Sequence, residues 1–291
     1  MARGSDSICK LLKLTGSRVS KSSLHRLAIL LAVAGTSLFI TGPAVSSNDA
    51  RPLYSLGQTH IWLGGVVFVL TAVIAFALWR TKAEPRVQRL GWIALALNIV
   101  EGLLGLVPDP QAAPVRVAHS LLGQIFFSLI FALVIFTAQS EQRIGASAQN
   151  AGLLRFVAIA TPALVLSQVA LGVVFRHGVT GVLPHILWAF VVAMFLVLVI
   201  AAVVSAGNPE IRKAGIAFTV IAGVQILLGF ALFIMQSVDI DPIYLIVVTA
   251  VHATTAALTL ATAVLLTIVI RRAISSAAAA PVGNMVTARR N

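Results

Sequence analysis

Residues 182–204 read VLPHILWAFVVAMFLVLVIAAVV, a run of 23 residues in which His185 is the single ionisable side chain. A helix of this length spans the hydrocarbon core of a bilayer, which is roughly 30 Å thick. The run does not alternate between apolar and polar residues, as the strands of a membrane barrel do. Because lipid offers no hydrogen-bond partner to exposed backbone groups, the run predicts a transmembrane helix.

Seven further apolar runs extend this pattern over most of the chain. The 291 residues are 59% hydrophobic and 10% charged, with a mean hydropathy of +0.99. Such a composition predicts an all-α integral membrane protein with eight transmembrane helices, whose solvent is the lipid bilayer. The expected helices cover residues 27–42, 58–79, 90–107, 115–138, 153–175, 182–204, 214–235 and 242–270.

The distribution of positive charge predicts how the chain is oriented. Eighteen of the 21 lysines and arginines fall on one side of the expected helices, and only Arg51, Arg116 and Arg176 fall on the other. Positive residues are held on the cytoplasmic side, so both termini are expected to be cytoplasmic. This pattern also accounts for the net charge of +12, and we expect no nucleic-acid partner. The single cysteine, Cys9, provides neither a disulfide nor a thiolate metal site within one chain.

The second half of the chain repeats the pattern of the first at an offset of about 125 residues. His60-Ile61-Trp62-Leu63 corresponds to His185-Ile186-Leu187-Trp188, Glu101-Gly102-Leu103-Leu104-Gly105 to Gln225-Ile226-Leu227-Leu228-Gly229, and His119 to His252. We therefore predict two repeated four-helix bundles. The expected parts are a basic cytoplasmic tail (1–23), an N-terminal bundle (24–140), a C-terminal bundle (151–272) and a cytoplasmic tail (273–291). A cleaved signal peptide is the alternative for the first helix, but the fifth helix has a counterpart only if the first is retained.

Four histidines occupy matching places in the repeat. His60 and His119 lie on the second and fourth expected helices, and His185 and His252 on the sixth and eighth. A lone intramembrane histidine can be a structural, hydrogen-bonded group, whereas ionisable residues at such depth are by default functional. Two imidazoles from facing helices of one bundle predict axial ligands of haem iron. Zinc fits less well, since two histidines without a nearby Cys, Asp or Glu leave its tetrahedral shell incomplete.

The three arginines on the outer side are close in sequence to these histidines. Arg51 precedes His60, Arg116 lies one turn before His119, and Arg176 precedes His185. Arg116 and Arg176 are therefore candidates for binding haem propionates, and ordinary snorkelling at the membrane interface is the alternative.

Eight helices with one histidine on each even-numbered helix resemble the haem A synthase family. Short strings extend the resemblance over residues 24–272, namely Thr41-Gly42, Leu171-Gly172-Val173-Val174-Phe175-Arg176-His177, Leu103-Leu104-Gly105 and Leu227-Leu228-Gly229. The resemblance implies an oxidoreductase in the plasma membrane of a prokaryote. It would oxidise the C8 methyl group of haem O to a formyl group, giving haem A for terminal oxidases.

The resemblance also implies roles for individual residues and partners. His60 and His119 would hold the substrate haem, and His185 and His252 a haem b cofactor. The implied partners are haem O, an unidentified electron donor and a haem O synthase, and a homo-oligomer is compatible with the sequence.

One departure from the family concerns the second helix. The family usually carries a glutamate three residues before the histidine of this helix and an arginine directly after it, where this chain has Gly57 and Ile61. Glu101, the sole acidic residue well inside an apolar run, is our candidate to replace that catalytic glutamate. The alternative is a protonated side chain that hydrogen-bonds between helices. Two other functions stay open: a di-haem b-type cytochrome that only transfers electrons, and a transporter or haem-handling assembly protein.

Overall fold

The computed structural model describes residues 20–45, 54–107, 112–138 and 150–278, and within these ranges all regular structure is helical. Each of the eight apolar runs forms one helix, which confirms the prediction of an all-α chain with eight helices long and apolar enough to cross a membrane. The helices are α2 (Lys21–Val45), α3 (Tyr54–Arg80), α4 (Pro85–Gly105), α5 (Ala113–Thr137), α6 (Ala151–Arg176), α7 (Leu183–Ser205), α8 (Pro209–Met235) and α9 (Pro242–Ala278).

Helix lengths and surface chemistry both fit a bilayer. The helices have 21 to 37 residues, and about 20 residues suffice to cross the hydrocarbon core. Large apolar side chains point outward, among them Trp62, Leu227 and Phe190, which are 73%, 70% and 68% exposed. Such a surface is unfavourable in water and ordinary in lipid. The chain therefore has the architecture of a multi-pass membrane protein.

Several helices begin where the sequence provides a starting signal. Proline, which has no backbone N–H to leave unpaired, occupies the first turn of five helices. These prolines are Pro85, Pro114, Pro184, Pro209 and Pro242. In α8 the side chain of Asn208 also accepts hydrogen bonds from the backbone N–H groups of Glu210 and Ile211, at 2.9 and 3.2 Å. These signals separate consecutive helices by short connections, so that neighbours in sequence pack as antiparallel pairs.

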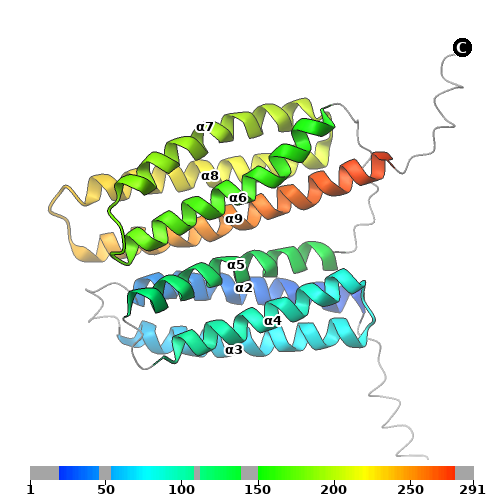
Figure 1. Cartoon of the computed structure of the whole chain (residues 1–291). Helices are drawn as coiled ribbons and strands as arrows, with labels where there is room; N and C mark the ends of the chain where they lie inside the picture. Colours follow the sequence, from blue (N-terminus) through cyan, green and yellow to red (C-terminus); the bar gives the residue numbers. More distant parts are fainter. Residues whose placement is uncertain (1–19, 46–53, 108–111, 139–149, 279–291) are drawn as a thin grey trace, which may run out of the picture.

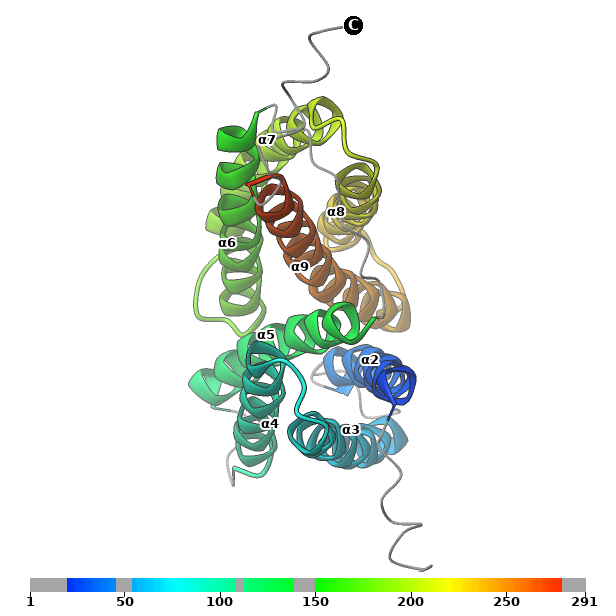
Figure 2. The same ribbon diagram turned by 90° about the vertical axis from the view of Figure 1, so that its right-hand side faces the viewer.

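The eight helices form two groups of four that lie side by side (Figures 1 and 2). In the first half (α2 to α5), α2 and α4 each contact both α3 and α5. In the second half (α6 to α9), α6 and α8 each contact both α7 and α9. Between the halves, α9 packs against α2 and α5, and α5 also contacts α6. Each half is thus a closed ring of four helices, and the two rings share one interface.

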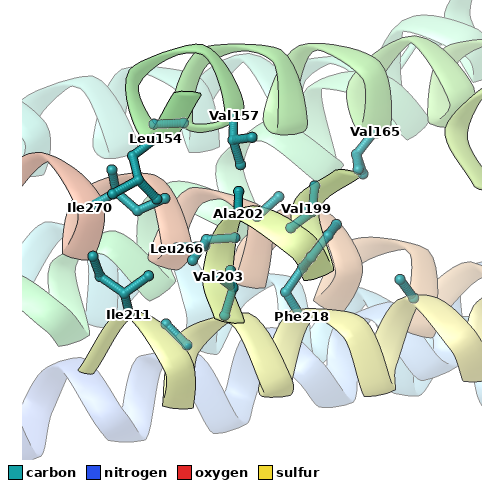
Figure 3. Close-up of a cluster of buried hydrophobic side chains, with 14 of the residues drawn as sticks. Leu154, Val157, Val165, Val199, Ala202, Val203, Ile211, Phe218, Leu266 and Ile270 are labelled. Carbon is teal, nitrogen blue, oxygen red and sulfur yellow. The ribbon is translucent and has the colours of Figure 1, made fainter. Parts of the chain in front are cut away.

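Each half concentrates its apolar core at one end. In the second half the large, fully buried side chains lie where α6 and α8 begin and α7 and α9 end (Figure 3). They include Leu154, Val157, Val199, Ile211, Leu266 and Ile270. The first half has the same arrangement, with Leu31, Ile74, Leu78, Ile130 and Leu133. This packing holds the helices together at one end. At the opposite end, where the histidines lie, polar contacts join the helices.

Two glycines allow close helix packing at corresponding places in the two halves. A Cβ atom at Gly215 would lie 2.5 Å from the side chain of Val203, and one at Gly91 would lie 3.0 Å from Leu78. The distance at Gly215 is too short for two non-bonded carbon atoms, and the distance at Gly91 is barely acceptable. Gly91 and Gly215 therefore let α4 and α8 approach the ends of α3 and α7 more closely than any other residue would.

The helices extend beyond several of the expected boundaries. The first helix begins at Lys21 and the last continues through Arg271 and Arg272 to Ala278. Apolarity marks only the part of a helix that lies in hydrocarbon, and basic residues continue a helix readily at the interface. The tails before residue 20 and after residue 278, with Cys9, lie outside the described residues, as do Arg51 and Arg143.

Candidate functional site

The four predicted histidines lie toward the same end of their helices, opposite the apolar cores. His60 and His119 are in the second turns of α3 and α5, His185 is in the first turn of α7, and His252 is in the first third of α9. Each imidazole contacts a polar side chain of the preceding helix, so the same motif occurs in all four helix pairs. The contacting pairs are Thr41 with His60, Glu101 with His119, Gln168 with His185, and Gln225 with His252.

In the first half, both imidazoles are held through Nδ1. The Thr41 hydroxyl lies 3.1 Å from Nδ1 of His60 and donates its own proton to the carbonyl of Leu38 at 3.0 Å. With its proton on the Leu38 carbonyl, the hydroxyl is an acceptor for Nδ1–H of His60, and this tautomer leaves the Nε2 lone pair available. Nδ1 of His119 lies 2.8 Å from Oε2 of Glu101. The other carboxyl oxygen of Glu101, Oε1, is buried and has no hydrogen-bond partner.

In the second half, two glutamine amides contact the imidazoles. The amide nitrogen of Gln168 lies 3.2 Å from Nδ1 of His185 and donates to the backbone carbonyl of the same residue at 3.2 Å. The amide nitrogen of Gln225 lies 3.2 Å from Nε2 of His252, whose Nδ1 is buried without a partner. The ring of Phe175 stacks on His185 with a centroid separation of 6.5 Å and an angle of 17°.

Glycines border three of the four imidazoles. A Cβ atom at Gly42 or Gly172 would lie 2.9 Å from Cε1 of His60 or His185, respectively. At Gly229 it would lie 3.2 Å from Cε1 of His252. At Gly42 and Gly172 any side chain would displace the ring, so the backbone itself forms the wall behind His60 and His185, and at Gly229 a side chain would press on His252.

The imidazoles come in pairs, one pair in each half. His60 and His119 lie on α3 and α5 of the first half, and His185 and His252 on α7 and α9 of the second. Among the described residues there is no group of three or more His, Cys, Asp or Glu side chains that could hold a metal ion. The predicted metal ligation by these histidines stays a prediction.

Comparison with known proteins adds no assignment. No protein-family model matches the chain, and no curated protein matches it. The resemblance to the haem A synthase family therefore stays a prediction that depends on the residues quoted above.

The donor atoms fit axial ligation of haem iron, most directly in the first half. There, Thr41 and Glu101 engage Nδ1 of His60 and His119, which leaves Nε2, the usual metal-binding nitrogen, for a ligand. In the second half the Gln225 amide donates to Nε2 of His252, so it would have to turn away first. A glutamine side chain can do this by rotating about its own torsions.

Arg176 and His177 connect the two halves on the histidine side. The Arg176 guanidinium donates a 2.7 Å hydrogen bond to the carbonyl of Pro43, at the end of α2. Nε2 of His177, which directly follows α6, lies 3.0 Å from the hydroxyl of Ser120 in α5. Ser120 is adjacent to His119, so this contact joins the second half to a histidine-bearing turn of the first.

His177 is not one of the four repeat-matched histidines, and the sequence predicts no role for it. In the structure its side chain is buried, at 8% exposure. Burial and the neighbouring charges of Arg176, Arg116 and His119 lower the pKa of His177 from 6.5 to about 4. The signal that could have drawn attention to His177 is its place next to Arg176 in the string that ends the fifth helix. Arg116 and Arg176 both lie near this residue, and their predicted contact with propionates stays a prediction.

The lowered pKa of His177 predicts a loss of stability in acid. Because the unfolded imidazole has the higher pKa, the unfolded chain binds the proton first as the pH falls. The contribution of His177 to stability is therefore constant above pH 6.5 and decreases between pH 6.5 and 4. The thermal unfolding midpoint in detergent should fall over this range, and by less in the His177→Gln variant, which keeps a hydrogen-bonding side chain. Equal falls in both proteins would contradict the assignment.

Proposed function

We propose that the chain is a haem A synthase-like oxidoreductase that converts the C8 methyl group of haem O into a formyl group. The observation that carries the proposal is the pair of imidazoles in each half, held at the same end of the helices, with three of the four against a glycine. In this proposal His60 and His119 hold the substrate haem, and His185 and His252 hold a haem b. The product, haem A, supplies terminal oxidases.

The proposal includes the arrangement of the chain in its membrane. The two halves are repeats, which the matching contacts of Gly91 with Leu78 and of Gly215 with Val203 support. Both termini are cytoplasmic, so the histidine end faces the outer side of a prokaryotic plasma membrane. Arg116 and Arg176 lie at that end, where a guanidinium can pair with a propionate while both reach water.

The chain's own groups supply binding, orientation and proton transfer. When bound, haem iron supplies redox chemistry that side chains lack. Thr41 and Glu101 orient the two imidazoles of the first half through Nδ1. Oxidation of a methyl group to a formyl group takes its oxygen atom from water and releases four protons and four electrons, and Oε1 of Glu101 is a buried acceptor without a hydrogen-bond partner. Glu101 is therefore our candidate for the proton acceptor. Electrons leave through a partner that the proposal does not identify.

A di-haem b-type cytochrome is the second candidate, and one observation favours it. Gly57 stands where the family's second helix usually carries its glutamate, and a side chain there would meet only Val45, at 3.9 Å. No carboxyl group is thus available on this helix turn. A cytochrome that only transfers electrons needs none.

The identity of the bound haems separates the two functions. The full-length chain is co-expressed with a haem O synthase and purified in detergent, and its extracted haems are identified by chromatography alongside a reduced spectrum. Haem B together with haem O or haem A is expected for the enzyme. Haem B alone supports the cytochrome, and a colourless protein contradicts both. Membranes from cells with the empty vector provide the control.

A further inference from the structure

The polar partners of the four histidines are not chemically alike. Three are neutral, and only Glu101 is a carboxylic acid. Glu101 and Gln225 occupy corresponding places, since each lies on the third helix of its half and contacts the histidine of the fourth. The two halves therefore place different groups beside this histidine: a carboxyl group at Nδ1 of His119 and a carboxamide at Nε2 of His252.

This difference enriches only the histidine ring of the first half. Oε2 of Glu101 lies 2.8 Å from Nδ1 of His119, and a carboxylate so close to the ring raises the electron density at Nε2. Gln225 is uncharged, and its amide contacts Nε2, the nitrogen that would bind iron, so it would turn away from a liganded His252 and add no electron density to that ring. The side chain of Glu101 is only 12% exposed, so water screens its effect on His119 weakly.

We propose that Glu101 is a positioning residue that makes His119 the stronger electron donor and gives the iron of the first half the lower reduction potential. The inference rests on the proposed ligation of one haem in each half. A more electron-rich ligand stabilises the oxidised iron, and hydrogen bonding to an axial ligand is one of the means by which a protein sets haem potentials. Electrons released in the first half would then pass toward the second, where the potential is higher.

The test exchanges the two partners in the full-length, haem-loaded protein. In Glu101→Gln, the first half takes on the chemistry of the second. We expect an unchanged haem content per chain, one midpoint potential raised beyond the scatter of repeated titrations, and the other unchanged. The reciprocal Gln225→Glu should lower the other potential. Both are measured by optical redox titration in detergent, which does not depend on haem O conversion.

Glu84→Gln provides the matched control. It makes the same chemical change just before α4, where the Glu84 side chain is 62% exposed and pairs with Arg86 rather than with a histidine. Both midpoint potentials should stay at their wild-type values. A shift in this control equal to that of Glu101→Gln would overturn the inference, because the effect would then be one of net charge.

The remaining outcomes separate the inference from the proposed function. If Glu101→Gln retains both haems and both midpoint potentials equal those of the wild type, the inference is overturned and the proposed function is not. If Glu101→Gln loses its haem, the Gln225→Glu variant becomes the test. An unchanged midpoint potential of the second-half haem in that variant would overturn the inference. A wild-type chain that binds two haems and never converts haem O contradicts the proposed enzyme and leaves the inference testable. A wild-type chain that binds no haem contradicts both.

Discussion

In the His252→Ala variant, bound haem B is expected to fall by more than about tenfold, because loss of a ligand costs at least as much affinity as loss of its supporting contacts. The His60→Ala variant should instead lose haem O and haem A and keep haem B. Each change removes one imidazole from one half, and the two pairs share no ring. Haem extraction and chromatography measure both losses, and haem A formation should stop in both variants.

His25→Ala is the matched control for these variants. His25 lies on α2 at the opposite end from the four histidines, and its Nδ1 contacts the hydroxyl of Thr137 at 3.3 Å. The substitution should leave both haems in place. A His252→Ala chain that retains all its haem B would place the ligand elsewhere and contradict the assignment of the second half.

Gly172→Leu should remove the haem of the second half without a change in any ligand. A Cβ atom at position 172 would lie 2.9 Å from Cε1 and 3.2 Å from Nδ1 of His185, so the ring must move. Overpacking of this kind costs about 1–3 kcal/mol and displaces side chains from their rotamers. The haem B content should fall sharply in Gly172→Leu and partly in Gly172→Ala. Extracted haem and the thermal unfolding midpoint measure the effect.

Gly223→Leu provides the comparison for this prediction. Gly223 is a helical glycine of α8 in the same half, and a Cβ atom there would meet no atom within 4 Å. This variant should bind haem as the wild type does. If Gly172→Leu also bound haem normally, the glycine wall behind His185 would have no part in the site.

The pairing of each histidine with a polar neighbour could be predicted only in part. Glu101 was a candidate from the sequence because an acidic residue inside an apolar helix is rare. Thr41 and Gln168 were not, since uncharged polar residues occur in membrane helices for many reasons. Their contacts with His60 and His185 depend on the rotation of α2 and α6 about their own axes. Nearly uniform apolarity leaves no amphipathic stripe from which that rotation could be read.

The burial of His177 is a second feature that the sequence could not reveal. A residue between two helices is normally exposed, and His177 is buried only because the end of α6 packs against α5 of the other half. Contacts between halves depend on the relative placement of two helix groups. A pattern within one helix carries no information on that placement.

The sequence by itself determined the number of helices and their approximate limits, because the thickness of the hydrocarbon core sets the length of every apolar run. It also determined which residues were candidates, because ionisable side chains are unfavourable in lipid. Only the tertiary structure decided which groups meet: the carboxyl group of Glu101 with His119, the amide of Gln225 with His252, and His177 with Ser120. These contacts depend on helix rotation and on packing between the halves, and an almost uniformly apolar sequence specifies neither.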